Sequence, residues 1–163
     1  MHSSAILNLE KFFSIYLKNF DNPKILDFGS QSLSDHIGAK VLLDKMNINY
    51  EYTGVDIEKG NNVDIVLEDP YSFKEIPDAA YDVIISTSVF EHVEFFWLTY
   101  LEILRILKPN GVITTQVGSQ DKKPEQVKKW MDVFNKNFGN TTLDRVYIPS
   151  FDCSWNFSSS INH

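Results

Sequence analysis

The fold of this chain is decided by residues 23–29, which read Pro-Lys-Ile-Leu-Asp-Phe-Gly. Consecutive apolar residues suit a strand that is buried on both faces, and Gly29 allows the backbone to turn sharply after it. A helix over 33–48 should follow, with Ser32 or Ser34 as its cap. A strand, a glycine turn and a helix leave backbone N–H groups free at the carboxyl edge of a sheet, where open α/β sheets bind ligands. The sequence therefore predicts a cofactor site at this turn.

Length and composition favour one globular domain over residues 1–163, with a core over 20–120. The chain has 163 residues, of which 43% are hydrophobic and 23% charged. That length supports one full core but not two domains of ordinary size. A sequence of this composition, without low-complexity stretches, is expected to fold as one unit.

Charge and cysteine content indicate the partners and the compartment. The formal net charge is −7 and the lysines are scattered, which argues against a nucleic-acid partner. The sequence has no apolar run long enough to span a membrane and no secretory leader, so we expect no membrane partner. Its one cysteine, Cys153, cannot form an internal disulfide, which suits the cytoplasm.

Strand and helix patterns alternate along the chain. Further strands are expected over 50–56, 63–67, 81–86, 112–117 and 143–148. Helices are expected over 3–20 and 124–138, and a third helix is expected where Leu98, Leu101, Leu104 and Leu107 lie on one face. The last fifteen residues are assigned no periodic pattern. Parallel neighbouring strands require crossover connections, so this alternation predicts a doubly wound α/β domain with a mostly parallel sheet and helices on both faces. Its C-terminal end is expected to be short, with one strand after residue 120.

Five segments in order carry a resemblance to a known family. They are Ile25–Ser30, Tyr52–Ile57, Leu67–Pro70, Tyr81–Ser86 with Phe90–His92, and Ile103–Gly111. Over residues 20–120 the chain resembles the class I S-adenosylmethionine-dependent methyltransferases, most of all the small-molecule branch often found beside polysaccharide biosynthesis enzymes. The resemblance implies a Rossmann-like methyltransferase fold, S-adenosylmethionine as cofactor and a small-molecule acceptor.

The resemblance also implies roles for individual residues. The expected cofactor-binding set is Asp27, Gly29, Ser30, Gln31, Asp56, Ile57, Asp69, Tyr71 and Ser86. Within it, Gly29 would pass under the methionine portion, and Asp56 would hold the ribose hydroxyls. Asp27 would accept a hydrogen bond from the ammonium through the loop or a water. Asp69 would lie near the adenine amino group, with Tyr71 or Ile57 beside the ring. The segment Ser86 to Ser88 would line the floor beneath the sulfonium.

The chemistry of the cofactor agrees with this set. A ribose diol offers two donors at a fixed separation, which one carboxylate can accept as charge-assisted hydrogen bonds. The family's usual first motif has two more glycines, where this chain has Gln31 and Leu33. A nicotinamide dinucleotide site would require glycines at 31 and 34, so Gln31 and Ser34 count against an oxidoreductase.

Methyl transfer requires mainly that donor and acceptor are held at near-attack geometry. If the acceptor is a hydroxyl, a general base helps, and His92 with Glu91 is the candidate pair after the fourth strand. The alternative is that His92 begins a helix and hydrogen-bonds locally. No metal-ligand spacing occurs in the sequence.

The sequence leads to two alternative hypotheses for the function of the chain. The first is an S-adenosylmethionine-dependent methyltransferase that acts on a small molecule, with a sugar or saccharide hydroxyl suggested by the resemblance. The alternative is a non-catalytic methyltransferase-like binding or assembly module. Phe95-Phe96-Trp97 with Tyr100 forms an aromatic cluster that suits the core, an acceptor cage or a subunit interface, so a homo-oligomer stays open.

Overall fold

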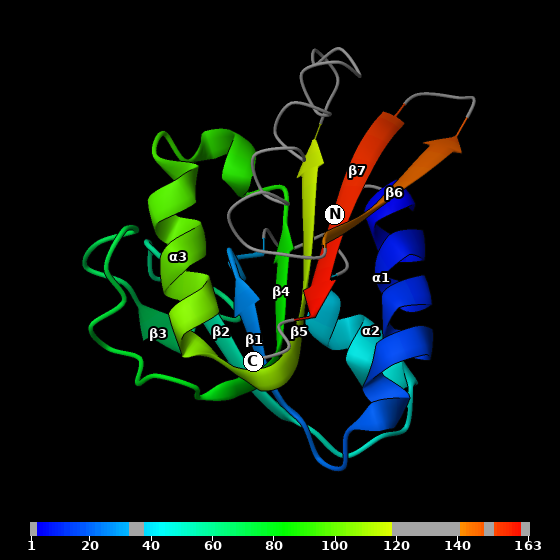
Figure 1. Cartoon of the computed structure of the whole chain (residues 1–163), viewed down its shortest axis with the longest axis horizontal. Coiled ribbons are helices and arrows are strands. Elements are labelled where there is room, and N and C mark those ends of the chain that lie inside the picture. The colour runs from blue at the N-terminus through cyan, green and yellow to red at the C-terminus, as the bar shows by residue number, and fades with distance from the viewer. Residues whose placement is uncertain (1–2, 33–37, 119–140, 149–151, 161–163) are drawn as a thin grey trace.

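The computed structural model describes residues 3–32, 38–118, 141–148 and 152–160. Seven strands of this described part form one sheet in the order β3-β2-β1-β4-β5-β7-β6 (Figure 1). The strands are β1 (Lys24–Phe28), β2 (Glu51–Asp56), β3 (Ile65–Val66), β4 (Tyr81–Thr87), β5 (Leu107–Gly118), β6 (Thr141–Ile148) and β7 (Asp152–Ser160). The helices are α1 (Ser3–Tyr16), η1 (Leu17–Asn19), α2 (Ala39–Lys45), η2 (Phe90–His92) and α3 (Phe96–Ile106). The predicted helix over 124–138 lies outside the described residues.

Strands β1 to β5 run parallel, and β7 pairs antiparallel with both β5 and β6. The carboxyl ends of β1, β2 and β4 therefore meet at one edge of the sheet. Crossovers place α1 and α2 on one face and α3 on the other (Figure 1). The prediction of a doubly wound, mostly parallel Rossmann-like sheet is confirmed.

Each face of the sheet has its own apolar core, because side chains of a strand alternate between faces. Ile25 of β1 packs with α1 and α2, whereas Leu26 and Phe28 pack with α3. These three side chains are nearly fully buried, as the consecutive apolar run predicts for a central strand. Helix α1 lies within the helix predicted over 3–20 and buries Leu9, Phe12 and Phe13 against the sheet, although Leu7 is 52% exposed.

Helix α2 is shorter than predicted. It begins at Ala39 after Gly38 as N-cap, and no side chain caps it. Ser34 lies outside the described residues, and Ser32 accepts a hydrogen bond from Asn62 instead of capping the helix. The helix ends at Lys45 because Asn47 takes a left-handed φ of 53°.

Helix α3 buries a different face from the leucine face that we predicted. Leu98 and Leu101 are 39% and 48% exposed, while Tyr100, Ile103 and Ile106 are buried against the sheet. Leu107 already belongs to β5. The leucines do share one side of the helix, but the branched and aromatic side chains cover the sheet.

The C-terminal strand β7 was missed in the sequence, and β3 was overestimated. Residues 152–160 lie between β5 and β6, so two strands rather than one follow residue 120. The sequence there alternates Cys153, Trp155 and Phe157 with polar residues, a weak signal that three successive serines obscure. β3 spans only two residues because the carboxylate of Asp64 accepts the N–H of Gly54, at 2.7 Å, just before it.

Candidate functional site

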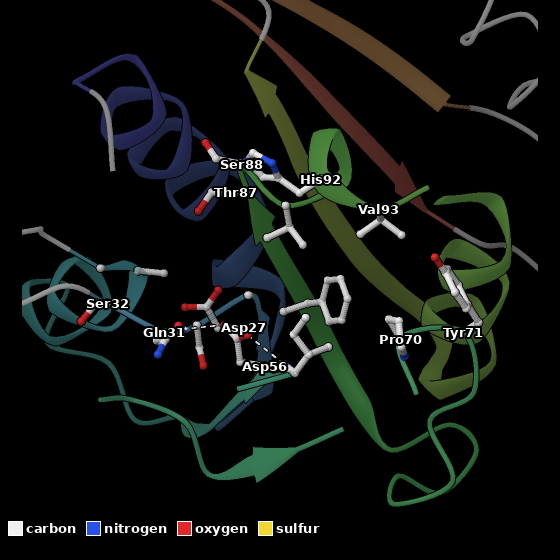
Figure 2. A pocket seen from close by; sticks show the side chains of 17 residues that line it. Asp27, Gln31, Ser32, Asp56, Pro70, Tyr71, Thr87, Ser88, His92 and Val93 are labelled. Carbon is white, nitrogen blue, oxygen red and sulfur yellow. Dashed lines mark hydrogen bonds between the residues drawn. The ribbon is translucent and has the colours of Figure 1, made fainter. Parts of the chain in front are cut away.

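A cavity of about 670 Å³ opens at the carboxyl ends of β1, β2 and β4 (Figure 2). Its lining residues come from five segments: Asp27 to Ser32, Gly38 with Ala39, Asp56 with Ile57, Pro70 with Tyr71, and Thr87 to Val89 with His92 and Val93. The volume falls within the range of about 300–1,000 Å³ that is usual for small-molecule sites. The predicted position of the cofactor site, at the turn after β1, coincides with this cavity.

The glycine turn after β1 is held tightly against its neighbours. Gly29 has a φ of +82°, and a Cβ on it would lie 2.1 Å from Cγ2 of Val89. The N–H groups of Gly29 and Ser30 both donate to the carbonyl of Val55, at 2.8 and 3.1 Å. A glycine is therefore required at position 29 by both the backbone conformation and the space.

The carboxylate of Asp56 at the end of β2 is oriented by backbone donors. Its Oδ2 accepts the N–H of Gln31 at 3.1 Å, and its Oδ1 accepts those of Ile57 at 2.8 Å and Glu58 at 3.3 Å. Ionised carboxylates have about four lone-pair sites, so acceptor capacity remains for a ligand. Asp56 lines the cavity, and Figure 2 shows its bond to Gln31.

The loop from Ser30 to Ser32 is braced by the segment before β3. Ser30 Oγ donates to the carbonyl of Asn62 at 2.8 Å, and Asn62 Nδ2 donates to Ser32 Oγ at 2.9 Å. The side chain of Gln31 lies against Gly60, where a Cβ would be 2.5 Å from Nε2. These contacts fix the loop that replaces the glycine-rich first motif.

Asp27 is the most buried acid in the cavity wall. It is 6% exposed, and its Oδ2 accepts the hydroxyl of Tyr52 at 2.8 Å. Burial raises the pKa of Asp27 to about 6, the bond from Tyr52 opposes that rise, and the charge of Asp56 adds to it. Asp27 therefore changes its charge near physiological pH.

The segment after β3 forms the wall that contains Pro70 and Tyr71. Asp69 Oδ1 accepts the N–H of Tyr71 at 2.8 Å, and Thr99 of α3 donates its hydroxyl to the carbonyl of Pro70 at 2.7 Å. Asp69 itself does not line the cavity. Its carboxylate holds the turn, and the neighbouring Pro70 and Tyr71 line the cavity instead.

The end of β4 contributes only part of the predicted floor. Thr87 and Ser88 line the cavity, but Ser86 is fully buried and does not. The reason is strand alternation, because Ser86 belongs to the face that packs with α3. Ser88 takes a left-handed φ of 59° and donates its N–H to the carbonyl of Gln116 at 2.8 Å.

Of the two residues predicted to act as general base, only one lines the cavity. His92 lines the cavity at the end of η2, near Ser88 in Figure 2, whereas Glu91 does not line it. The N–H of His92 donates to the carbonyl of Val89 at 2.8 Å, as in a short helical turn. Val89 and Val93, which sequence reasoning overlooked, add apolar surface beside His92.

Two kinds of feature are absent from the part of the chain that the structure describes. No group of three or more His, Cys, Asp or Glu side chains within it could hold a metal ion. None of its helices is long and apolar enough to cross a membrane.

Comparisons with known proteins point to one class. Residues 36–115 match the family model described as a methyltransferase domain, a match that begins after the glycine turn. A Methanococcus maripaludis structure described as a putative S-adenosylmethionine-dependent methyltransferase is 16% identical, with a TM-score of 0.68 over 98% of this chain and 85% of that one. The 1,6-didemethyltoxoflavin-N1-methyltransferase of Burkholderia thailandensis, solved with S-adenosylhomocysteine, is 14% identical, with a TM-score of 0.67 over 98% and 79%. None of the curated proteins compared with the chain matches it.

The family match over residues 36–115 and the fold agree on a methyltransferase domain. The fold of the chain is that of the solved methyltransferases to which it is similar. The cavity suits S-adenosylmethionine as a ligand, because Gly29 leaves room at the turn and the carboxylates of Asp27 and Asp56 match a cation and a diol. This set also discourages a phosphate-bearing ligand.

Proposed function

We propose that this chain transfers a methyl group from S-adenosylmethionine to an oxygen of a small molecule, with sugar or saccharide hydroxyls as the acceptor class. The observation that carries the donor half is the convergence of Asp27, Gly29 and Asp56 on one cavity at the sheet edge. The acceptor class rests on the sequence resemblance alone, since fold does not fix substrate. We further propose that residues 1–163 act as one cytoplasmic domain.

The residues of the cavity have separate binding roles in this proposal. Asp56 accepts the ribose hydroxyls with the lone pairs that its backbone donors leave free. Tyr71 and Ile57 flank the adenine ring from two walls, and Asp27 with the turn at Gly29 receives the methionine portion. Ser30 and Gln31 act through their backbone, which closes the loop onto β2.

The catalytic contribution of the chain is orientation and proton removal. S-adenosylmethionine supplies a methyl group already activated by its sulfonium. The apolar surface of Val89 and Val93 excludes water beside the reacting atoms, and His92 accepts the proton of an acceptor hydroxyl. Glu91 has no direct role because it does not line the cavity.

The donor half is tested by calorimetric titration with S-adenosylmethionine, S-adenosylhomocysteine and NAD. We expect micromolar binding of the first two and none of NAD. Asp56→Asn should weaken binding at least tenfold, because a charge-assisted acceptor is lost. Glu51→Gln is the matched control, since Glu51 is exposed at the opposite end of the same strand.

The acceptor half is tested by mass spectrometry of methylated products from a panel of saccharides and other hydroxyl compounds. His92→Gln should lower kcat about 100-fold or more for a hydroxyl acceptor while donor affinity stays unchanged. A folded protein that binds none of the three cofactors would contradict the enzyme proposal. That result would favour the alternative function, a non-catalytic assembly module, for which the exposed Phe95 and Trp97 offer a contact surface.

A further inference from the structure

Tyr52 reaches Asp27 because of the register between β1 and β2. The cross-strand partner of Asp27 is Gly54, and that of Ile25 is Tyr52. Since Gly54 has no side chain, the place beside Asp27 is free for a long side chain from the diagonal position. The Tyr52 hydroxyl fills it and donates to Oδ2 of Asp27 at 2.8 Å.

The bond leaves one carboxylate oxygen of Asp27 for the cavity. Among the described residues, Oδ1 accepts no hydrogen bond, and Asp27 lines the cavity wall. From β4, the register partner of Asp27 is the apolar Ile85. In the described part of the chain, Tyr52 is therefore the polar group that sets the direction of this carboxylate.

Several charged groups act on the pair. The charge of Asp56 opposes ionisation of Asp27, whereas the Tyr52 hydroxyl favours it. Burial, Asp27 and Asp64 all raise the pKa of Tyr52, so its hydroxyl stays protonated and remains a donor. Lys40 lies with its Nζ 5.4 Å from the centre of the Tyr52 ring and holds that ring from α2.

We propose that Tyr52 is a positioning residue, which aims Asp27 at the cavity and keeps it ionised so that the ammonium group of a bound ligand finds a charged partner. The proposal rests on the proposed donor site. Its consequence is that an ammonium-bearing ligand binds with release of a proton from Asp27 to the buffer when the pH lies below the midpoint of Asp27. The affinity should then fall as the pH is lowered, and the pH at which it falls should depend on the hydrogen bond from Tyr52.

The expected shift follows from the lost hydrogen bond. Tyr52→Phe keeps the ring but removes the donor, which should raise the midpoint of Asp27 from near 6 by about one pH unit. If only the ionised form binds, affinity for S-adenosylhomocysteine should drop about fivefold at pH 6, and by less than about 1.5-fold at pH 7.5. A purely structural role would lower the affinity by the same factor at both pH values.

The experiment is calorimetric titration with S-adenosylhomocysteine between pH 5 and pH 7.5, in buffer pairs of different ionisation enthalpy that count released protons. Tyr50→Phe is the matched control, because Tyr50 lies just before the same strand and donates to Asp44, away from the cavity. Asp27→Asn should abolish the proton release assigned to Asp27. It separates that signal from protons exchanged by other residues that line the cavity.

The outcomes separate the two proposals. Absence of binding by the wild-type protein at every pH would contradict the donor site itself. If the wild type binds, an unchanged midpoint in Tyr52→Phe, or proton release as large in Asp27→Asn as in the wild type, would overturn the role of Tyr52. A raised midpoint in Tyr52→Phe, with Tyr50→Phe unchanged from the wild type, would establish it.

Discussion

The substitution Gly29→Ala tests the turn after β1. Two costs add in the structure. A non-glycine residue in the left-handed region, here at a φ of +82°, costs about 1–2 kcal/mol. The new Cβ would also lie 2.1 Å from Cγ2 of Val89, and overpacking of this kind costs about 1–3 kcal/mol.

The expected loss in the free energy of unfolding is therefore roughly 2–5 kcal/mol, a large part of the roughly 5–15 kcal/mol of a typical domain. Denaturant titration measures it, with an unchanged slope showing that the unfolded state is the same. Gly38→Ala is the control, because φ there is −88° and the nearest atom to a Cβ is 4.0 Å away. Its loss should stay below about 1 kcal/mol.

A second variant isolates the steric part. Val89→Ala removes the methyl groups that the new Cβ would meet, so the double variant Gly29→Ala with Val89→Ala should recover about 1–3 kcal/mol relative to additivity. The backbone part should remain. A loss below about 1 kcal/mol in Gly29→Ala, or strict additivity in the double variant, would refute this account of the turn.

Three further predictions concern the cavity wall and its support. Asp27→Asn should raise the free energy of unfolding at pH 7 by up to about 3 kcal/mol. The reason is that the pKa of Asp27 is higher in the folded than in the unfolded protein, so the wild type loses stability as the pH rises from about 4 to 6. Denaturation at pH 4 and pH 7 measures this effect, and an equal gain at both would refute it. Thr99→Val should weaken S-adenosylhomocysteine binding about threefold to tenfold in calorimetry by freeing the carbonyl of Pro70, while Thr99→Ser should restore it. Arg105→Met should destabilise the fold by about 1–3 kcal/mol and raise the pKa of Glu102 toward its ordinary value, as seen by NMR titration of that carboxyl.

The central strands could be predicted because burial on both faces constrains sequence strongly. The central positions of β1 and β4 are buried and mostly apolar, with Ile25, Leu26 and Phe28 in β1 and residues 83–85 in β4. A helix face is less determined, since an exposed leucine is as acceptable as a buried one. The exposed Leu98 and Leu101 of α3 show this limit.

The edge of the sheet could not be predicted with the same success. β7 is rich in serine, and although it follows β6 directly in the sequence it also pairs with the distant β5, so its place in the sheet depends on a contact far away in the sequence. β3 begins only at Ile65, because the side chain of Asp64 just before it takes the N–H of Gly54 and competes with the backbone ladder. Neither effect is visible in a local pattern.

The sequence predicted the place of the cavity, because several strands end in acidic residues at the same edge of the sheet. In the structure these acidic residues have different roles. Asp27 and Asp56 line the cavity, whereas Asp69 closes a turn. The position of Tyr52 against Asp27 depends on the register of β1 with β2 and on the missing side chain at Gly54. Such a contact needs the structure, because its two residues are 25 positions apart.

The loop after β1 shows how a site can lack glycines that its family usually has. Gln31 is outside the left-handed region, so its backbone does not require a glycine. Its N–H donates to Asp56, which any residue except proline could provide, and its side chain lies against Gly60. A Cβ on Gly60 would lie 2.5 Å from Nε2 of Gln31, so a larger residue there would have to displace the end of that side chain. Only Gly29, which combines a positive φ with a close neighbour, keeps the original requirement.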